Sequence, residues 1–224
     1  MALDLRTGSS EMLAGAVRAH QALARLAELA EDLRILSLNA ELAAGRAGEQ
    51  GRSIRVLTLA TRELVRQLTT IAERLGELKA TTYGASAGAL KTHHRLRIIE
   101  RAARLQHDDS TLAGLNSATE RFLALIADDM SQVADCIQAL SQQASRVSAI
   151  AVHAGTIATN IAIEAASAGQ HTTQFLTVSQ TMQRYAEELR RMTEEARGAL
   201  SRVQRAGGTL RGHPADGKQY KGAA

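Results

Sequence analysis

The 224-residue sequence is poor in aromatic residues, proline and cysteine. With two Phe, three Tyr and no Trp, it lacks the side chains that usually fill a large β-sheet core. Its single proline leaves long helices uninterrupted, and its single cysteine excludes an intrachain disulfide framework. No apolar run approaches the ~20 residues that cross a bilayer, and the N-terminal MALDLRTGSS lacks the plan of a signal peptide. We therefore expect a soluble, cytoplasmic protein.

The residues that are abundant, Ala, Leu, Arg, Glu and Gln, favour long helices packed through small and medium side chains. Lys and Arg number 27 against 23 Asp and Glu, and the two signs are mixed along the chain. A sequence pI of about 9.6 is the one support for a basic bundle that binds nucleoid or membrane. This interpretation stays open as a minor alternative.

Apolar residues recur at alternating steps of three and four over two adjoining segments. This heptad spacing is typical of helices that pack along one stripe. The first stripe consists of Met12, Gly15, Ala19, Ala22, Leu26, Leu29, Leu33, Leu36, Ala40, Ala43 and Ala47, and the second of Ile54, Leu57, Thr61, Leu64, Leu68, Ile71, Leu75 and Leu78. Between the stripes, Gly48 and Gly51 predict a tight reversal, because glycine adopts the positive φ values that such a turn needs.

The same arrangement returns 121 residues later, with Gly169 at the position of Gly48. The shifted stripes consist of Val133, Cys136, Leu140, Gln143, Val147, Ile150, Ala154, Ile157 and Ile161, followed by Phe175, Val178, Met182, Tyr185, Leu189, Met192, Ala196 and Ala199. Gln143 alone does not suit an apolar core, and it fits either a buried polar group that sets the register or a wet edge. The pattern predicts an internal repeat of two long helical hairpins.

We therefore predict an all-α fold, namely a long antiparallel four-helix coiled-coil bundle made of two helical hairpins. Both tips lie at one end in this prediction, and a helical extension lies at the other. Two chains that exchange hairpins would bury the same stripes. The predicted segments are an N-terminal tail (1–8), a first receptor-like hairpin (9–90, tip 48–52), a connecting helical extension (91–130), a second receptor-like hairpin (131–207, tip 169–173) and a disordered tail (208–224).

Local signals predict where these helices begin and end. Ser9 or Ser10 is a suitable N-cap for the first helix, and Gly84 and Gly88 predict a break or kink in the second. The stretch LQHDDST, 105–111, predicts a turn inside the connecting extension. Asp109 or Ser110 would then cap the following helix.

The stretch LNAELAAGRAGEQGRSI, 38–54, resembles the hairpin tip in the signalling domain of methyl-accepting chemotaxis receptors. The run RAGEQGR carries most of the resemblance, because it includes polar residues that a simple turn does not require. The stretch TNIAIEAASAGQHTTQF, 159–175, resembles the same tip through Asn160, Ile163, Glu164, the alanines and Phe175. Outside the two tips the sequence is that of a generic coiled coil.

In that family the signalling domain is a dimer of one-hairpin subunits, whose tips cluster and contact a coupling protein and a histidine kinase. The resemblance implies a soluble chemotaxis signalling protein that mimics a receptor dimer in one chain, either as a monomeric pseudo-dimer or as a homodimer. From the lack of a long apolar run and from the mixed charge, we expect no membrane insertion and no nucleic-acid partner. The residues it implicates are a partner-binding tip of Asn39, Arg46, Glu49, Gln50, Arg52, Ile54 and Val56, a second tip of Asn160, Glu164 and Phe175, and the turn glycines Gly48, Gly51 and Gly169.

The two tips depart from the family pattern to different degrees. Ala43 stands where the family has a glutamate, although Glu164 keeps it in the second copy. The second copy replaces the polar apex, with Ser167 in place of arginine and QHTTQ in place of EQGRG. If partner contact needs the full motif, only the first tip docks. A structural helical-bundle scaffold without kinase contact is the alternative function.

No residue pattern predicts catalysis, a cofactor or a metal site. His93 and His94 are adjacent on a helix and point about 100° apart, so they do not converge on one ion. Cys136 occupies a stripe position, where a buried and inert thiol is expected. The sequence contains no Ser-His-Asp arrangement, phosphate-binding loop or zinc cluster, and we expect a protein that is not an enzyme.

Overall fold

The computed structural model describes residues 2–105 and 108–211, and these residues are almost entirely helical. No β-strand occurs within these two ranges, which confirms the prediction of an all-α helical bundle. In chain order the elements are α1 (Ala2–Ala22), α2 (Leu26–Arg46), the 3-10 turn η1 (Gly48–Gly51), α3 (Arg52–Leu105), α4 (Asp109–Ala165), the 3-10 turn η2 (Gly169–His171) and α5 (Thr172–Arg211).

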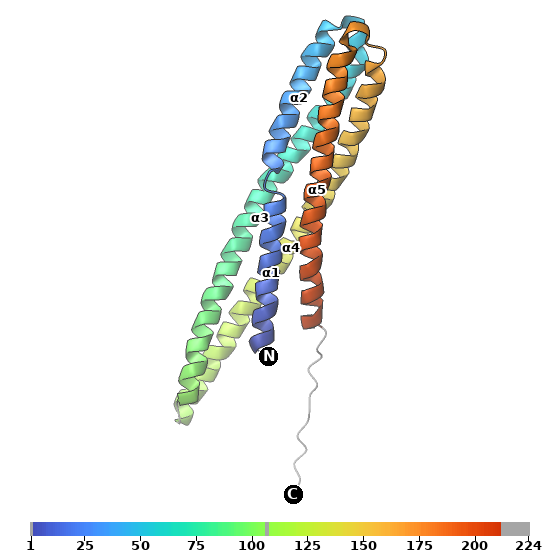
Figure 1. Ribbon diagram of the computed structural model, residues 1–224. Coiled ribbons are helices and arrows are strands. Elements are labelled where there is room, and N and C mark those ends of the chain that lie inside the picture. Colours follow the sequence, from blue (N-terminus) through green and yellow to red (C-terminus); the bar gives the residue numbers. More distant parts are fainter. Residues whose placement is uncertain (1, 106–107, 212–224) are drawn as a thin grey trace.

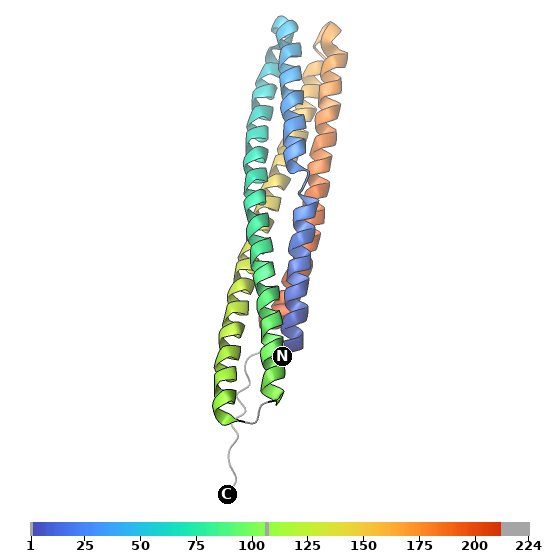
Figure 2. The ribbon, with the colours of Figure 1, turned by 90° about the vertical axis from the view of Figure 1, so that its left-hand side faces the viewer.

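The helices lie side by side and form a long rod (Figures 1 and 2). The turns η1 and η2 are at the same end of this rod, and a Cβ built on Gly169 would lie 3.5 Å from Gln50 Oε1. At the opposite end α3 and α4 continue together beyond α1 and α5 (Figures 1 and 2). The rod is therefore thickest in its upper part and consists of two helices at its far end.

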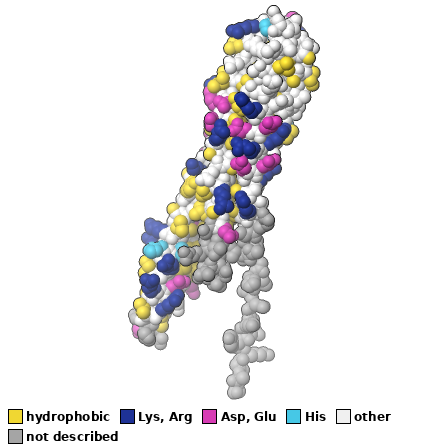
Figure 3. All heavy atoms as spheres, viewed as in Figure 1, with side chains coloured by type: hydrophobic (Ala, Val, Ile, Leu, Met, Phe, Trp, Pro, Cys, Tyr) yellow, Lys and Arg dark blue, Asp and Glu magenta, His cyan; other side chains and the backbone are white. Residues whose placement is uncertain are grey.

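The predicted stripes form the core of the rod. Every residue of the four stripes is buried or half-buried, and the most completely buried large side chains include Leu29, Leu33, Leu140 and Phe175. Removing such apolar surface from water stabilises the fold by about 25 cal/mol per Å². Charged side chains occupy the outside along the length of the described part (Figure 3).

Gln143 is a buried polar group rather than a wet edge. It is 6% exposed, and its Oε1 has no hydrogen-bond partner within the described ranges. A buried amide oxygen without a partner costs free energy, so Gln143 weakens the core in which it lies. Cys136, one heptad earlier on α4, is buried as predicted.

The helix starts differ from the predicted caps. Helix α1 begins at Ala2 and runs through Ser9 and Ser10, so neither serine is the N-cap and residues 2–8 are helical. The MALDLR sequence that precedes them consists largely of good helix formers, which extends the helix past the serines.

Helix α4 is capped one residue before the predicted position. The cap is Asp108, in an extended conformation, and its carboxylate accepts a hydrogen bond from the Thr111 backbone N–H at 3.0 Å. The hydroxyls of Ser110 and Thr111 donate to the same oxygen at 2.6 and 2.7 Å. These hydrogen bonds lower the pKa of Asp108 below its usual value.

The break predicted at Gly84 and Gly88 does not occur, because α3 is continuous from Arg52 to Leu105. A Cβ on Gly84 would contact nothing, whereas one on Gly88 would lie 2.9 Å from a carboxylate oxygen of Asp129 on α4. Gly88 therefore lies where α3 and α4 approach closely, and packing on α4 outweighs the low helix propensity of glycine.

The first stripe was predicted as one helix, but the chain interrupts it between α1 and α2. Here the hydrogen bonds tighten to three-residue steps, from Ala24 N–H to the Gln21 carbonyl and from Leu26 N–H to the Leu23 carbonyl, both at 3.2 Å. Within the break, Arg25 Nη1 lies 2.6 Å from Glu188 Oε1 on α5. Neither glycine nor proline is present at the break, so no local sequence signal marked it.

The C-terminal prediction is wrong at its start. Helix α5 extends to Arg211, so residues 208–211 are helical and do not belong to a disordered tail. Residues 212–224 of the predicted tail, like residues 106 and 107 of the predicted turn, lie outside the described residues.

One window within Ser110–Ala165 is apolar and long enough to cross a membrane by length and composition, contrary to the expectation from the sequence. Of this window, 39% is buried inside the bundle. A core helix that packs on several neighbours meets the same criterion, so the window is weak evidence for a membrane span.

Candidate partner-binding tip

The two turns at the end of the rod share one backbone feature. Gly48 has a φ of 59° and Gly169 a φ of 56°, in the left-handed region where glycine is favoured. They are the two residues with positive φ within the described ranges, and they are 121 positions apart. Each turn then continues as a short 3-10 segment into the next long helix.

Gly51 is needed for a different reason from the one predicted, because its φ is not positive. A Cβ at this position would lie 2.1 Å from the carbonyl oxygen of Ala44, so the chain can close here only without a side chain. In the second turn Thr172 occupies the equivalent position. Its hydroxyl donates to the carbonyls of Ala165, at 2.9 Å, and Gly169, at 2.8 Å.

One buried hydrogen bond joins the two helices below each turn. The Ser37 hydroxyl on α2 donates to the Thr58 carbonyl on α3 at 3.2 Å. The Ser179 hydroxyl on α5 donates to the Ala158 carbonyl on α4 at 2.7 Å. The two pairs occupy equivalent positions at the 121-residue offset, with the donor on the opposite helix in the second copy.

The polar residues predicted for the first tip lie on its surface. Asn39, Arg46, Glu49, Gln50 and Arg52 are all exposed. The side chains of Glu49 and Arg52 are 91% and 80% exposed, and their closest charged atoms are 3.9 Å apart. A solvated pair of this kind contributes little to stability, so both groups are available to a partner.

Two residues predicted for the partner-binding tips are core residues. Ile54 and Phe175 are both 0% exposed, so neither can contact a partner directly. Each lies at the beginning of its stripe, where the apolar side chain packs beneath the turn. In the second tip Asn160 is exposed and Glu164 is half-buried.

A row of exposed apolar residues beside the first tip was largely missed by the sequence interpretation. Leu42 is 62% exposed and Val56, the one member predicted, is 64% exposed. Ile35, Leu38 and Leu59 are exposed as well, and we call these five outward-facing residues of α2 and α3 the apolar tip surface. Its members on α2 are spaced by three and four residues and point away from the core stripe. This second apolar spacing was the sequence signal that could have predicted an exposed apolar surface.

The second copy lacks most of this surface. The residues at the equivalent positions are Thr156, Thr159, Ile163, Thr177 and Gln180, of which Ile163 alone is a large apolar residue. The two turns thus have similar backbones and different surfaces.

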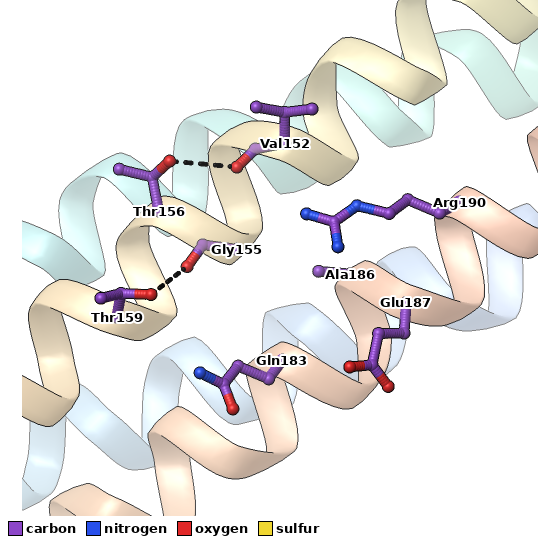
Figure 4. A pocket seen from close by; sticks show the side chains of 8 residues that line it. All are labelled: Val152, Gly155, Thr156, Thr159, Gln183, Ala186, Glu187 and Arg190. Carbon is purple, nitrogen blue, oxygen red and sulfur yellow. Dashed lines mark hydrogen bonds between the residues drawn. The ribbon is translucent and has the colours of Figure 1, made fainter.

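A shallow pocket of about 410 Å³ lies between α4 and α5, below the second turn (Figure 4). The small residues Gly155 and Ala186 leave the space for this pocket. The Arg190 guanidinium reaches across it, and a Cβ built on Gly155 would lie 3.0 Å from Arg190 Nη2. The hydroxyls of Thr156 and Thr159 donate to backbone carbonyls of their own helix. No nucleophile with an adjacent base lines the pocket.

The other titratable candidates do not converge. His94 and His153 are exposed and His93 is half-buried, and His107 lies outside the described residues. Across the described part of the chain, no three His, Cys, Asp or Glu side chains gather in a way that could hold a metal ion.

Comparison with known protein families, with curated proteins and with solved structures gave no match for this chain.

Proposed function

We propose that this chain is a non-enzymatic, cytoplasmic, receptor-like chemotaxis signalling protein. In this proposal residues of each half form an antiparallel hairpin, and the two hairpins together mimic a receptor dimer. The first tip then contacts a chemotaxis histidine kinase and its coupling protein. The alternative is a scaffold bundle that keeps the two hairpins and makes no kinase contact.

The repeated geometry of the turns supports the pseudo-dimer. Positive φ at Gly48 and Gly169 and the equivalent serine hydrogen bonds below them recur at one offset. Such agreement in register is expected of duplicated units that pack around one axis. The proximity of Gly169 to Gln50 supports the same arrangement.

The observation that carries the proposal is the composition of the first tip. It presents exposed charges, Glu49 and Arg52, at the turn and exposed apolar side chains, such as Leu42 and Val56, on the helices that enter and leave it. A protein–protein contact of this kind combines an apolar centre with a polar rim. A rigid apex also lowers the entropy that binding costs, because its side chains are held on packed helices.

Co-sedimentation with purified kinase and coupling protein tests the proposal. We expect the wild-type chain to sediment with the two partners, and Glu49→Ala to weaken that binding. Leu42→Ser combined with Val56→Ser should weaken it by about tenfold or more, as expected when central apolar contacts are lost.

The second tip supplies the matched control. Ile163→Ser combined with Thr177→Ser changes the equivalent positions on α4 and α5 and should leave binding within about twofold, as expected for residues outside the contact surface. Absence of binding by the wild type, or equal binding by wild type and both first-tip variants, would favour the scaffold.

A further inference from the structure

The far end of α3 carries a row of exposed basic and apolar residues that the proposed tip function does not use. Helix α3 advances about 100° per residue, so residues spaced by three, four and seven share a face. On that basis one sector of about 120° contains a set that we call the basic face. It consists of Leu90, His94, Arg97, Ile98, Arg101, Arg104 and Leu105.

All members of the basic face are exposed. Leu90 is 65%, Ile98 57% and Leu105 74% exposed, which is high for large apolar side chains. Lys91 and Arg95 are also exposed and lie beside this sector. Figure 3 shows the Lys, Arg and His side chains gathered at this end of the rod, with apolar side chains among them.

One acidic residue, Glu100, lies beside these cations and lines a shallow depression with Arg97, Arg101 and Arg104, so the basic face keeps an excess of positive charge. Among the side chains that the structure describes (11–105, 108 and 110–203), the ion pairs found do not involve Lys91, Arg95, Arg97, Arg101 or Arg104. The neighbouring end of α4 is mainly acidic: Asp108, Glu120 and Asp128 are exposed, against one exposed basic residue, Arg121. Since α3 and α4 pack side by side, with Leu96 and Ile126 buried, their outward faces point in opposite directions.

The extension is therefore mainly positive on the α3 side and mainly negative on the α4 side. A flat anionic surface would attract the α3 side, and the α4 side would point away from it. A basic face about 22 Å long, from Leu90 to Leu105 at 1.5 Å per residue, is long enough to lie along such a surface.

Apolar residues among the cations distinguish between two kinds of anionic partner. Phosphates of a nucleic acid would use the arginines and leave Leu90, Ile98 and Leu105 in water. A lipid surface uses both, because the headgroups attract the arginines while the apolar side chains enter the boundary with the acyl chains.

We propose that the basic face docks the far end of the rod on the surface of an anionic lipid bilayer. The helix lies in the interfacial plane and does not cross the bilayer. The arginine stems extend along the apolar boundary, and the guanidinium groups reach the headgroup phosphates. This site is at the opposite end of the rod from the tip and is independent of the tip's partners.

Vesicle co-sedimentation of the full chain tests this docking. Vesicles of phosphatidylcholine alone are compared with vesicles that contain about 30% phosphatidylglycerol, which supplies the negative surface potential. We expect binding to the anionic vesicles alone, and weaker binding as salt is raised.

The variant Arg97→Glu, Arg101→Glu, Arg104→Glu should bind the anionic vesicles about 100-fold more weakly, or worse, since each basic residue near the surface contributes about a factor of five. A control with the same change in net charge is Arg146→Glu, Arg184→Glu, Arg202→Glu, all at exposed sites elsewhere on the rod. It should bind within about twofold of the wild type, because charges beyond a Debye length of about 10 Å are screened.

The variant Leu90→Ser, Ile98→Ser, Leu105→Ser keeps every charge and should lose about tenfold in vesicle binding. Circular dichroism verifies that each variant keeps its helix content. Equal binding to neutral vesicles, or no effect of the arginine variant, overturns the proposal. Tight binding to a DNA duplex together with unchanged vesicle binding by the serine variant also overturns it and identifies a nucleic-acid surface.

Discussion

Gly51 shows how the absence of one carbon atom determines the shape of the first turn. The Ala44 carbonyl occupies the space that a Cβ at this position would need. In the second turn Thr172 is at the equivalent position, and its hydroxyl donates at 2.9 Å to the equivalent carbonyl, that of Ala165, so the carbonyl there leaves room for a side chain. The same position of the turn therefore has no side chain in the first copy, Gly51, and a hydrogen-bonded side chain in the second, Thr172.

Gly51→Ala should lower the free energy of unfolding by about 2 kcal/mol or more, because the turn must open to admit the new carbon. Gly45→Ala is the matched control, since a Cβ there meets nothing within 4 Å and the residue lies inside α2. That variant should be neutral or more stable by up to about 1 kcal/mol. Urea unfolding followed by circular dichroism measures both, and equal effects of the two substitutions would refute the steric argument.

At the residue scale the sequence predicted well which residues are buried in the core. It predicted less well what individual residues, such as Gly51, do in the structure. Heptad spacing alone identified the buried stripes, because burial on a helix follows directly from periodicity. It also identified Ile54 and Phe175 as stripe residues, whereas the family resemblance assigned them to a contact surface, and the structure buries both. Spacing could not reveal the φ of Gly51, which depends on how the turn closes in three dimensions.

At the element scale the local signals and the packing disagree. Gly84 and Gly88 signalled a break in α3, and the helix continues through both because it packs along α4, closely so at Gly88. The break that does occur, between α1 and α2, has no glycine or proline to mark it. Helix interruptions in this chain follow the contacts between helices, which a single sequence does not contain.

Helix α1 packs on α3 partly through a buried histidine. His20 is 7% exposed, and its Nε2 lies 3.5 Å from Thr82 Oγ1, whose hydroxyl donates to the Leu78 carbonyl at 2.7 Å. Burial lowers the pKa of His20 below 6.5, and the nearby positive charge of Lys79 lowers it further. The folded chain therefore favours the neutral imidazole.

This lowered pKa makes the attachment of α1 sensitive to acid. In the unfolded chain the imidazole binds a proton near its ordinary pKa of 6.5. The unfolded state then holds more protons than the folded state between that value and the lower folded pKa, so stability rises with pH there. We expect the free energy of unfolding to fall as the pH is lowered from about 7.5 to about 5.5.

The variant His20→Gln should show a smaller loss of stability over the same pH interval, because it has no group to protonate at this position. Urea unfolding of both proteins at the two pH values gives the comparison. His153→Gln removes an exposed histidine and serves as control. If His20→Gln loses as much unfolding free energy over this pH interval as the wild type, the pH dependence comes from other groups.

At the scale of the whole molecule, both turns lie at one end and the two halves meet along the rod. A single chain can achieve this alone, or two chains can exchange their halves, and the stripes would be buried equally well. The proximity of Gln50 and Gly169 offers a direct measurement. In a chain folded on itself these residues belong to one molecule.

Gln50→Cys combined with Gly169→Cys and Cys136→Ala leaves two thiols, both at the tip. A short bismaleimide should join them within one chain and give a product of monomer mass. The positive φ at position 169 costs the cysteine about 1 kcal/mol, which a long bundle can tolerate. Gln50→Cys with Cys136→Ala alone is the control, and a crosslinked product of twice the monomer mass in the double-cysteine chain would show exchange between two chains.

The interruption between α1 and α2 has a mechanical consequence for the rod. Along their whole lengths up to the turns, α3, α4 and α5 each transmit rotation or translation through an unbroken ladder of backbone hydrogen bonds. The fourth path along the rod, α1 followed by α2, is interrupted at Leu23–Arg25, where backbone hydrogen bonds span three residues instead of four. A torque applied to α1 would be absorbed partly at this joint, so movement at the N-terminal end would reach the apex less completely than movement of the other three helices.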